Sequence, residues 1–258
     1  MRNILTVRHL SKDFGGIKAV DACSFSVPEG KIVGLIGPNG AGKTTVFNII
    51  TGFLTPTSGH VLLDGVAIGG SSPDSVARRG ISRTFQSIRL FPNMTVIDNM
   101  MLGRKNEREG IADALFRIPS LAAEERQHET QCMSFLEFVG LTAKKDELAK
   151  NLSYGQQKLL EIARALVGEP EILLLDEPAA GVNLTMLAKI SELLKKLRRQ
   201  GKTILLIEHN MEFVMGLCDT VVVLDYGKEI AVGTPAQVRK NKKVLDAYLG
   251  GIDTKIVT

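Results

Sequence analysis

The chain has 258 residues, of which 44% are hydrophobic and 23% are charged. At about 150 residues per domain, this length predicts one large domain or two modest ones, with a core that needs no disulfide or metal. These fractions exclude collagen-like, disordered and disulfide-scaffold proteins. The net charge of +4 is too small to indicate a nucleic-acid-binding protein by itself.

No run of apolar residues reaches the roughly 18 positions that a membrane-spanning helix needs. Residues 1–10 carry charges where a secretory signal would have its apolar core. The three cysteines, Cys23, Cys132 and Cys218, lack metal-ligand spacing, so we expect them to be reduced and buried. These observations predict a soluble cytosolic protein.

In chain order, short strands are predicted within residues 4–10 and 18–36, the last of them the apolar strand 31–36. A glycine-rich loop and a helix with apolar residues at helical spacing follow. Asp64-Gly65 lies between two apolar runs and predicts a hairpin with a type I′ turn.

The character of the sequence changes after residue 86. From 87 to about 165 no strand-like run occurs, and helical patterns alternate with charged segments. The mostly polar stretch 104–131 is divided by Pro119-Ser120, which predicts two helices in either a solvated insertion or a contact with a partner.

From residue 172 onward, strands and helices alternate, which predicts a parallel sheet covered by helices. One of these helices is expected at 185–200, ended by Gly201. Its cations at 195–199 could form a nucleic-acid patch, although a solvated helix face fits the pattern better. The capping box Thr234-Pro-Ala-Gln237 predicts the start of the last helix.

The segment Gly37-Pro-Asn-Gly-Ala-Gly-Lys-Thr44 matches the phosphate-binding pattern G-x-x-x-x-G-K-[ST]. Backbone N–H groups of such a loop converge on phosphate oxygens, and the following helix adds its positive N-terminal end. Lys43 can reach the outer phosphates, and the hydroxyl of Thr44 can hold Mg²⁺. Because the loop follows a predicted strand and begins a predicted helix, a mere turn with a solvated lysine is disfavoured. The residues expected to bind nucleotide here are Gly37, Pro38, Asn39, Gly40, Ala41, Gly42, Lys43, Thr44 and Thr45.

The run Ile172-Leu-Leu-Leu-Asp-Glu177 predicts a buried strand that ends in two carboxylates. At the carboxyl edge of a parallel sheet, Asp176 can hold Mg²⁺ beside the phosphate loop, and Glu177 can orient or deprotonate an attacking water. Alone, the run could be a strand followed by an acidic surface turn. Together with the phosphate loop, it predicts a nucleoside triphosphatase.

Leu152-Ser-Tyr-Gly-Gln156 precedes a strongly amphipathic helix, with Ser153 as its predicted N-cap and Gly155 permitting close backbone approach. By pattern alone this is an ordinary capped helix. Its place between the phosphate loop and the Asp-Glu pair makes the chain resemble the ATP-binding subunits of ABC transporters across residues 4–250, with this segment as their signature motif.

The resemblance implies an α/β fold: a P-loop NTPase core with a mostly parallel sheet and helices on both faces, an N-terminal antiparallel β subdomain and an inserted α-helical subdomain. It assigns residues 1–86 and 166–238 to the core, 87–165 to the helical subdomain, and 239–258 to a C-terminal helix and tail. ATP and Mg²⁺ are the implied cofactors.

The same resemblance assigns roles to single residues. Gln86 is expected to contact Mg²⁺ or the attacking water, and His209 the γ-phosphate. Phe14 is expected to stack on adenine, with a core phenylalanine as the alternative. For His209 the alternative is a structural histidine at a strand end.

The implied dimer is head to tail, so that each bound ATP is covered by the signature motif of the opposing subunit. The residues expected to do this are Ser153, Gly155 and Gln156. Two residues depart from the family pattern: Tyr154 replaces a signature glycine, and Asn183 replaces the usual aspartate of the loop after Glu177.

Both departures fit a narrower resemblance, to the longer ATP-binding subunit of branched-chain amino acid importers. It also includes Pro178-Ala-Ala-Gly181, the run from Glu208 to Met215, and the ending Ala247-Tyr-Leu-Gly250. The implied partners are a second ATP-binding subunit (the same chain or a different one), transmembrane permeases and, indirectly, a periplasmic substrate-binding protein, with no nucleic acid. The implied location is cytoplasmic, on the inner face of the membrane. Urea, amide or lipid transport remains an alternative, as does a non-transport ATPase acting on DNA or ribosomes.

Overall fold

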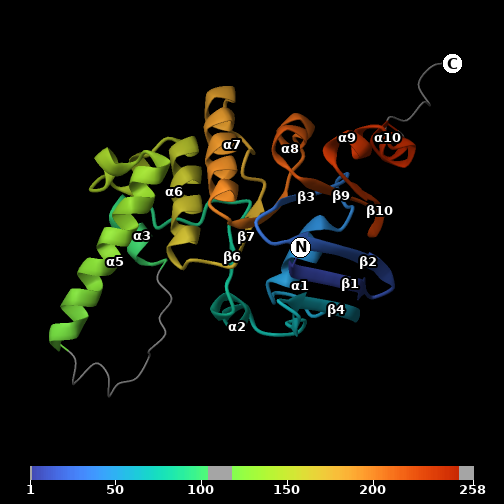
Figure 1. The fold of residues 1–258 in the computed structure, drawn as a ribbon, viewed down its shortest axis with the longest axis horizontal. Coiled ribbons are helices and arrows are strands. Elements are labelled where there is room, and N and C mark those ends of the chain that lie inside the picture. The colour runs from blue at the N-terminus through green and yellow to red at the C-terminus, as the bar shows by residue number, and fades with distance from the viewer. Residues whose placement is uncertain (1, 104–117, 250–258) are drawn as a thin grey trace.

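The computed structural model describes residues 2–103 and 118–249. It contains two sheets (Figure 1). The four-stranded sheet has the order β2-β1-β4-β5, from β1 (Asn3–Phe14), β2 (Ile17–Pro28), β4 (Ser58–Leu63) and β5 (Val66–Ala67), and its pairs are antiparallel. The predicted antiparallel subdomain is therefore confirmed, with longer strands than the sequence indicated.

The six-stranded sheet has the order β10-β9-β3-β8-β7-β6. Its strands are β3 (Ile32–Ile36), β6 (Ile81–Arg83), β7 (Ile172–Asp176), β8 (Thr203–Ile207), β9 (Thr220–Asp225) and β10 (Lys228–Gly233). All neighbours pair in parallel except β9 and β10. This mostly parallel sheet confirms the predicted fold class.

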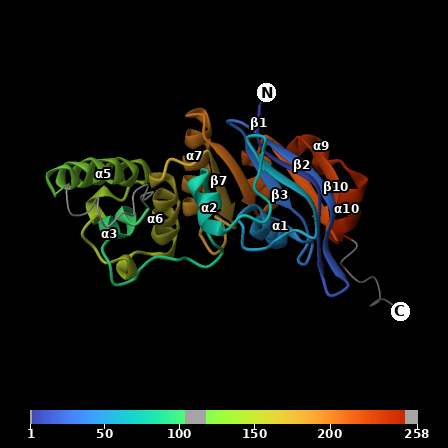
Figure 2. The same cartoon turned by 90° about the horizontal axis from the view of Figure 1, so that it is seen from below.

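The helices are α1 (Lys43–Ile50), α2 (Pro73–Arg78), α3 (Val96–Met101), α5 (Ile118–Val139), α6 (Tyr154–Val167), α7 (Leu184–Arg199), α8 (Met211–Leu217), α9 (Pro235–Arg239) and α10 (Lys242–Leu249), with 3₁₀ turns η1 (Thr142–Lys144) and η2 (Ala149–Asn151). Between β6 and β7, the described residues form helices and one isolated bridge, Thr95–Leu148. In both views, α3, α5 and α6 lie at one end and the two-sheet region at the other (Figures 1 and 2).

Strand β7 is buried on both faces. Leu173 and Leu175 belong to the core cluster that includes α6, α7 and α8, whereas Ile172 and Leu174 belong to the cluster shared with α1 and the four-stranded sheet. A strand covered on both faces needs the continuous apolar run seen in the sequence. Two cores thus hold the central sheet fixed between helices and the second sheet.

Some local predictions are confirmed and others need correction. Asp64 and Gly65 have φ values of 47° and 77°, as a type I′ hairpin requires, and the three cysteines are free and buried. Pro119 lies in the first turn of α5, and the predicted helix before it falls in residues 104–117, which lie outside the described chain, so that division stays a prediction. Thr234 caps α9 as predicted, but α9 is not the last helix, because α10 follows it.

In the described ranges, no helix combines the length and apolarity needed to cross a membrane.

Candidate active site

Parallel pairing brings three functional segments to one edge of the six-stranded sheet. Ile207 is aligned with both Leu35 and Asp176, so β3, β8 and β7 end at the same level. The loop after β3, the carboxylates at the end of β7 and the residues after β8 therefore emerge side by side. This is the sequence-predicted site.

The phosphate loop depends on glycine at two positions with positive φ. A side chain at Gly37 (φ 153°) would collide with the carbonyl of Leu224, and one at Gly42 (φ 95°) with the carbonyl of Ala19. Gly42 begins α1 without any side-chain cap, whereas the helices that start after Ser72, Thr95, Ser153, Asn183, Asn210 and Thr234 are capped by those side chains. The first turn of α1 thus keeps N–H groups available to an anion.

Lys43 is only 5% exposed, and its Nζ donates to the carbonyl oxygens of Gly37 and Pro38, each at 2.8 Å. Burial lowers its pKa, while the nearby carboxylates of Glu177 and Asp176 oppose that shift. The ammonium is therefore held inside the loop, in the field of both acidic residues. Thr44 and Asn39 are exposed beside it.

Glu177 is contacted by two of the predicted catalytic residues. Its Oε1 lies 2.7 Å from Nε2 of His209, and its Oε2 accepts a hydrogen bond of 3.1 Å from Nε2 of Gln86. The three side chains come from the segments after β7, β8 and β6. The structure therefore brings Gln86, Glu177 and His209 together, as the sequence predicted.

Phe14, at the end of β1, is 46% exposed, and Nζ of Lys12 lies 5.0 Å from the centre of its ring. The alternative of a core phenylalanine is therefore wrong. An exposed aromatic ring offers a face on which a nucleobase can stack.

The signature segment lies apart from the phosphate loop of its own chain. Ser153 caps α6 in a reciprocal capping box with Gln156, as its predicted N-cap role requires. A Cβ at Gly155 would lie 2.7 Å from Cγ of Met186, so this glycine admits the Met186 side chain. In both views, β7 lies between α6 and α1 (Figures 1 and 2).

The two departures from the family pattern have structural counterparts. The ring of Tyr154 lies against Gly181, where a Cβ would be 3.1 Å from Cε1 of the tyrosine. Asn183 caps α7 by accepting a hydrogen bond of 2.9 Å from the N–H of Met186. Tyr154 therefore joins the start of α6 to the loop after Glu177, and Asn183 joins the start of α7 to the same loop.

Arg83 is a site residue that sequence reasoning missed. Its guanidinium forms an ion pair of 2.7 Å with Oδ2 of Asp176 and donates to Asn48 and Thr51, at 2.7 and 3.0 Å. Both members of the pair are nearly buried, with side-chain exposures of 7% and 6%. The one feature that could have indicated it is that Arg83 is the last residue of β6, the strand that pairs with β7.

Three side chains of α6, also missed, hold the segment that follows Gln86. Nζ of Lys158 donates to the carbonyl of Gln86 at 3.2 Å, Glu161 accepts from the N–H of Arg89 at 3.3 Å, and Arg164 donates to the carbonyl of Arg89 at 2.6 Å. Lys158, Glu161 and Arg164 lie three residues apart, on one face of the helix. The helix that begins at the signature motif is thereby bonded to the loop that carries Gln86.

The cations of 195–199 are mostly engaged within the chain. Lys195 pairs with Glu192 and Arg198 with Asp219, at 3.0 and 2.9 Å, while Nζ of Lys196 lies 4.5 Å from the centre of the Phe138 ring.

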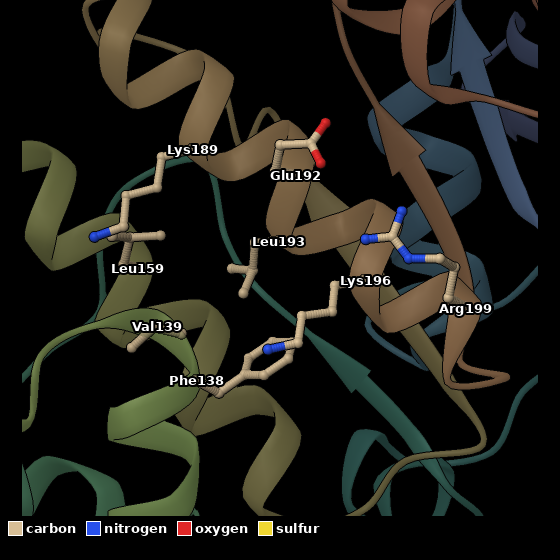
Figure 3. Close-up of a pocket in the computed structure, with 8 residues that line it drawn as sticks. All are labelled: Phe138, Val139, Leu159, Lys189, Glu192, Leu193, Lys196 and Arg199. Atoms are coloured by element: carbon tan, nitrogen blue, oxygen red, sulfur yellow. The ribbon is translucent and has the colours of Figure 1, made fainter.

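A cavity of about 280 Å³ lies between the end of α5, α6 and α7 (Figure 3). Its lining is Phe138, Val139, Leu159, Lys189, Glu192, Leu193, Lys196 and Arg199.

Comparison with known proteins identifies the family. The family model described as ABC transporter matches residues 20–180. This chain belongs to the ABC transporter family. A second model, described as branched-chain amino acid ATP-binding cassette transporter, matches residues 228–254.

Curated relatives of this ABC protein cover nearly the whole chain. It is 44% identical to the high-affinity branched-chain amino acid transport ATP-binding protein BraF of Pseudomonas aeruginosa, over 96% of this chain and 98% of the relative. The identity to LivG of Escherichia coli, which carries the same description, is also 44%, with the same coverage of both chains.

Solved structures of ABC cassettes share the fold. The ADP conformation of MJ1267, an ATP-binding cassette of an ABC transporter, matches with a TM-score of 0.85 and 35% identity, covering 97% of this chain and 100% of that one. A nucleotide-free cassette matches with a TM-score of 0.83 and 35% identity, covering 95% and 98%. The chain is a nucleotide-binding ATPase of this family.

Proposed function

We propose that this ATPase powers the import of branched-chain amino acids through partner permeases. The observation that carries the proposal is the likeness, at 44% identity over nearly the full chain, to proteins named for that transport. The match of the C-terminal residues 228–254 to a branched-chain amino acid cassette model supports the same cargo. Substrate choice then lies in the permeases and in a periplasmic binding protein, and not in this chain.

ATP would bind at the sheet edge, with its phosphates on the 37–45 loop. The uncapped start of α1 and the ammonium of Lys43 supply donors and positive charge for the outer phosphates. Lys43 would exchange its two carbonyl acceptors for phosphate oxygens. Phe14 would stack on the adenine.

Hydrolysis would use Glu177 as the base for an attacking water. His209, 2.7 Å from its carboxylate, would contact the γ-phosphate, and Gln86, which donates to the other carboxylate oxygen, would orient the water. The three side chains reach the site from separate strands, so their relative positions depend on the sheet edge being intact.

The residues at this edge fit a magnesium ion. The proposed ligands, Thr44, Gln86 and Asp176, offer only oxygen donors, which Mg²⁺ prefers. Arg83 binds Oδ2 of Asp176, which leaves Oδ1 as the oxygen for a metal. Bound Mg²⁺ would neutralise part of the phosphate charge.

A second ATP-binding subunit would complete the site. The start of α6 lies away from α1 of the same chain, so Ser153, Gly155 and Gln156 would cover nucleotide bound to an opposing subunit, in a homodimer or a heterodimer. A second helix start adds N–H donors to the γ-phosphate and excludes water. Loss of that phosphate would let the subunits separate.

Coupling to the membrane would pass through the helical residues 87–165, which we propose to act as one subdomain between the core segments 1–86 and 166–238. The bonds from Lys158, Glu161 and Arg164 to residues 86–89 connect α6 to Gln86, and so would connect it to the proposed metal and attacking water. A permease docked there, on the inner face of the membrane, would sense the nucleotide state. Residues 239–258 would form a C-terminal helix and tail.

The experiment is uptake of radiolabelled leucine by proteoliposomes that contain this chain and candidate permeases from the same organism, with a candidate binding protein outside and ATP inside. Leucine uptake that requires ATP, and that fails with Glu177→Gln, supports the proposal. Uptake of urea or an amide without leucine would instead support the neighbouring transport class, and ATP turnover with no transport would contradict both.

A further inference from the structure

Glu208 is a buried carboxylate just after the end of β8, beside the proposed catalytic residues. Its exposure is 3%, and within residues 2–103 and 118–249 no lysine, arginine or histidine forms an ion pair with it. Burial raises the pKa of Glu208, with a further contribution from the negative charge of Glu177. Burying such a group disfavours folding unless its hydrogen-bonding needs are met.

Backbone N–H groups from two separate loops meet those needs. Oε1 of Glu208 accepts a hydrogen bond of 2.7 Å from Ala179, and Oε2 accepts from His209 and Asn210, at 3.1 and 3.4 Å. One carboxylate thus joins the loop after β7 to the loop after β8. The two oxygens are divided between the loops, so a side chain with a single acceptor could not serve both.

Each of these loops carries one half of the Glu177–His209 pair. Ala179 lies two residues after Glu177, and His209 directly follows Glu208. Glu177 itself has a φ of 51°, a left-handed conformation that is strained for a residue with a side chain. Such a conformation persists only when surrounding bonds hold the backbone. Here two hydrogen bonds do so: the N–H of Glu177 donates to the carbonyl of Ile207, and the N–H of Ala179 donates to the carboxylate of Glu208.

We infer that Glu208 is a positioning residue for ATP hydrolysis: by holding both loops, it sets the distance between the carboxylate of Glu177 and the imidazole of His209. Its side chain is buried, and it would act only through those two side chains. The inference rests on the roles proposed above for Glu177 and His209.

The test is a double-mutant cycle of Glu208→Ala and His209→Ala, read as steady-state ATP turnover and, separately, as ATP affinity. Because small displacements of catalytic groups cost about 10- to 100-fold in rate, Glu208→Ala should lower kcat by that range. The Kd for ATP should not change, since the phosphate loop is untouched. In the His209→Ala background, Glu208→Ala should lower kcat little further, since the pair that it positions is already broken.

Two further variants separate positioning from folding. Glu208→Gln has the same shape but one acceptor oxygen, so its kcat should lie between those of wild type and Glu208→Ala. Glu229→Ala removes a carboxylate whose pKa is also raised by burial and which accepts from the N–H of Ser24, and it should leave kcat unchanged.

The outcomes distinguish this inference from the proposed function. Normal turnover in His209→Ala would overturn the role of the histidine. A large loss in His209→Ala with normal turnover in Glu208→Ala would overturn this inference alone. Fully multiplicative losses in the double variant, or a parallel loss of ATP affinity, would contradict the inference, because Glu208 would then affect turnover by a route other than the Glu177–His209 pair.

Discussion

Arg83 and Asp176 form a buried ion pair of 2.7 Å at the edge of the sheet where the nucleotide would bind. The arginine is the last residue of β6 and the aspartate the last of β7. Parallel pairing sets Arg83 level with Leu174, two residues before Asp176, so both residues lie at the same edge of the sheet. The same guanidinium bonds Asn48 and Thr51, at the end of α1 and just beyond it. One side chain thus ties the helix of the phosphate loop to the carboxylate proposed as a metal ligand.

We expect Arg83→Ala to be strongly destabilising. Removing one member of a buried pair leaves a buried charge without compensation, which costs about 3 to 5 kcal/mol of unfolding free energy. Urea denaturation followed by circular dichroism measures this change. Arg2→Ala is the matched control, because Arg2 pairs with Asp64 on the surface. The urea concentration at the unfolding midpoint should be the same for Arg2→Ala as for wild type. Similar midpoints for the two variants would contradict the importance of the buried pair.

Lys43→Ala should abolish measurable ATP binding while preserving the fold. The lysine is the cation held at the centre of the phosphate loop, and its loss also removes two hydrogen bonds to loop carbonyls. Fluorescent-nucleotide titration compares the variant with Lys240→Ala, which removes an exposed lysine far along the chain. Equal affinities for the two variants would reject the loop assignment.

Asn183 should tolerate aspartate and not alanine. Both asparagine and aspartate can accept the N–H of Met186 at the start of α7, whereas alanine cannot, and loss of an N-cap costs about 1 kcal/mol. In thermal unfolding, wild type and Asn183→Asp should therefore have the same melting temperature, and Asn183→Ala should have a lower one. A drop in Asn183→Asp as large as that in Asn183→Ala would show that the cap is not what this position supplies.

The three cysteines should resist thiol reagents in the folded protein. Burial raises the pKa of Cys23 and Cys218 to about 12 and that of Cys132 to about 11, so thiolate is scarce at pH 8. Reaction with dithiobis-nitrobenzoate should release little colour until denaturant is added, and then three equivalents. Rapid reaction of one thiol in native conditions would place that cysteine at the surface.

Much of this molecule was predictable from sequence because its local patterns agree with its fold. The phosphate loop and the strand before Asp176 are recognised from short runs whose geometry is set within the run itself. Glu177 was predicted from the apolar run that ends in Asp176 and Glu177, whereas Gln86 and His209 followed only through the family resemblance, since nothing local indicates that three strand ends meet.

The partners of those residues were not predictable. Arg83, Lys158 and Glu208 act through bonds to segments more than 25 residues away in the chain, as when Lys158 reaches the carbonyl of Gln86. Which partners these side chains contact depends on the strand order of the sheet and on which face of α6 is covered.

The most direct test of the account is Glu177→Gln, measured for ATP affinity and for ATP turnover in the same preparation. The amide keeps the size of the side chain and can still contact Gln86 and His209, but it cannot take a proton from water. We predict unchanged ATP affinity and a turnover lower by about 10²- to 10⁴-fold, with an ATP-bound dimer accumulating on a sizing column. Turnover equal to that of wild type would contradict the assignment of Glu177 as the base.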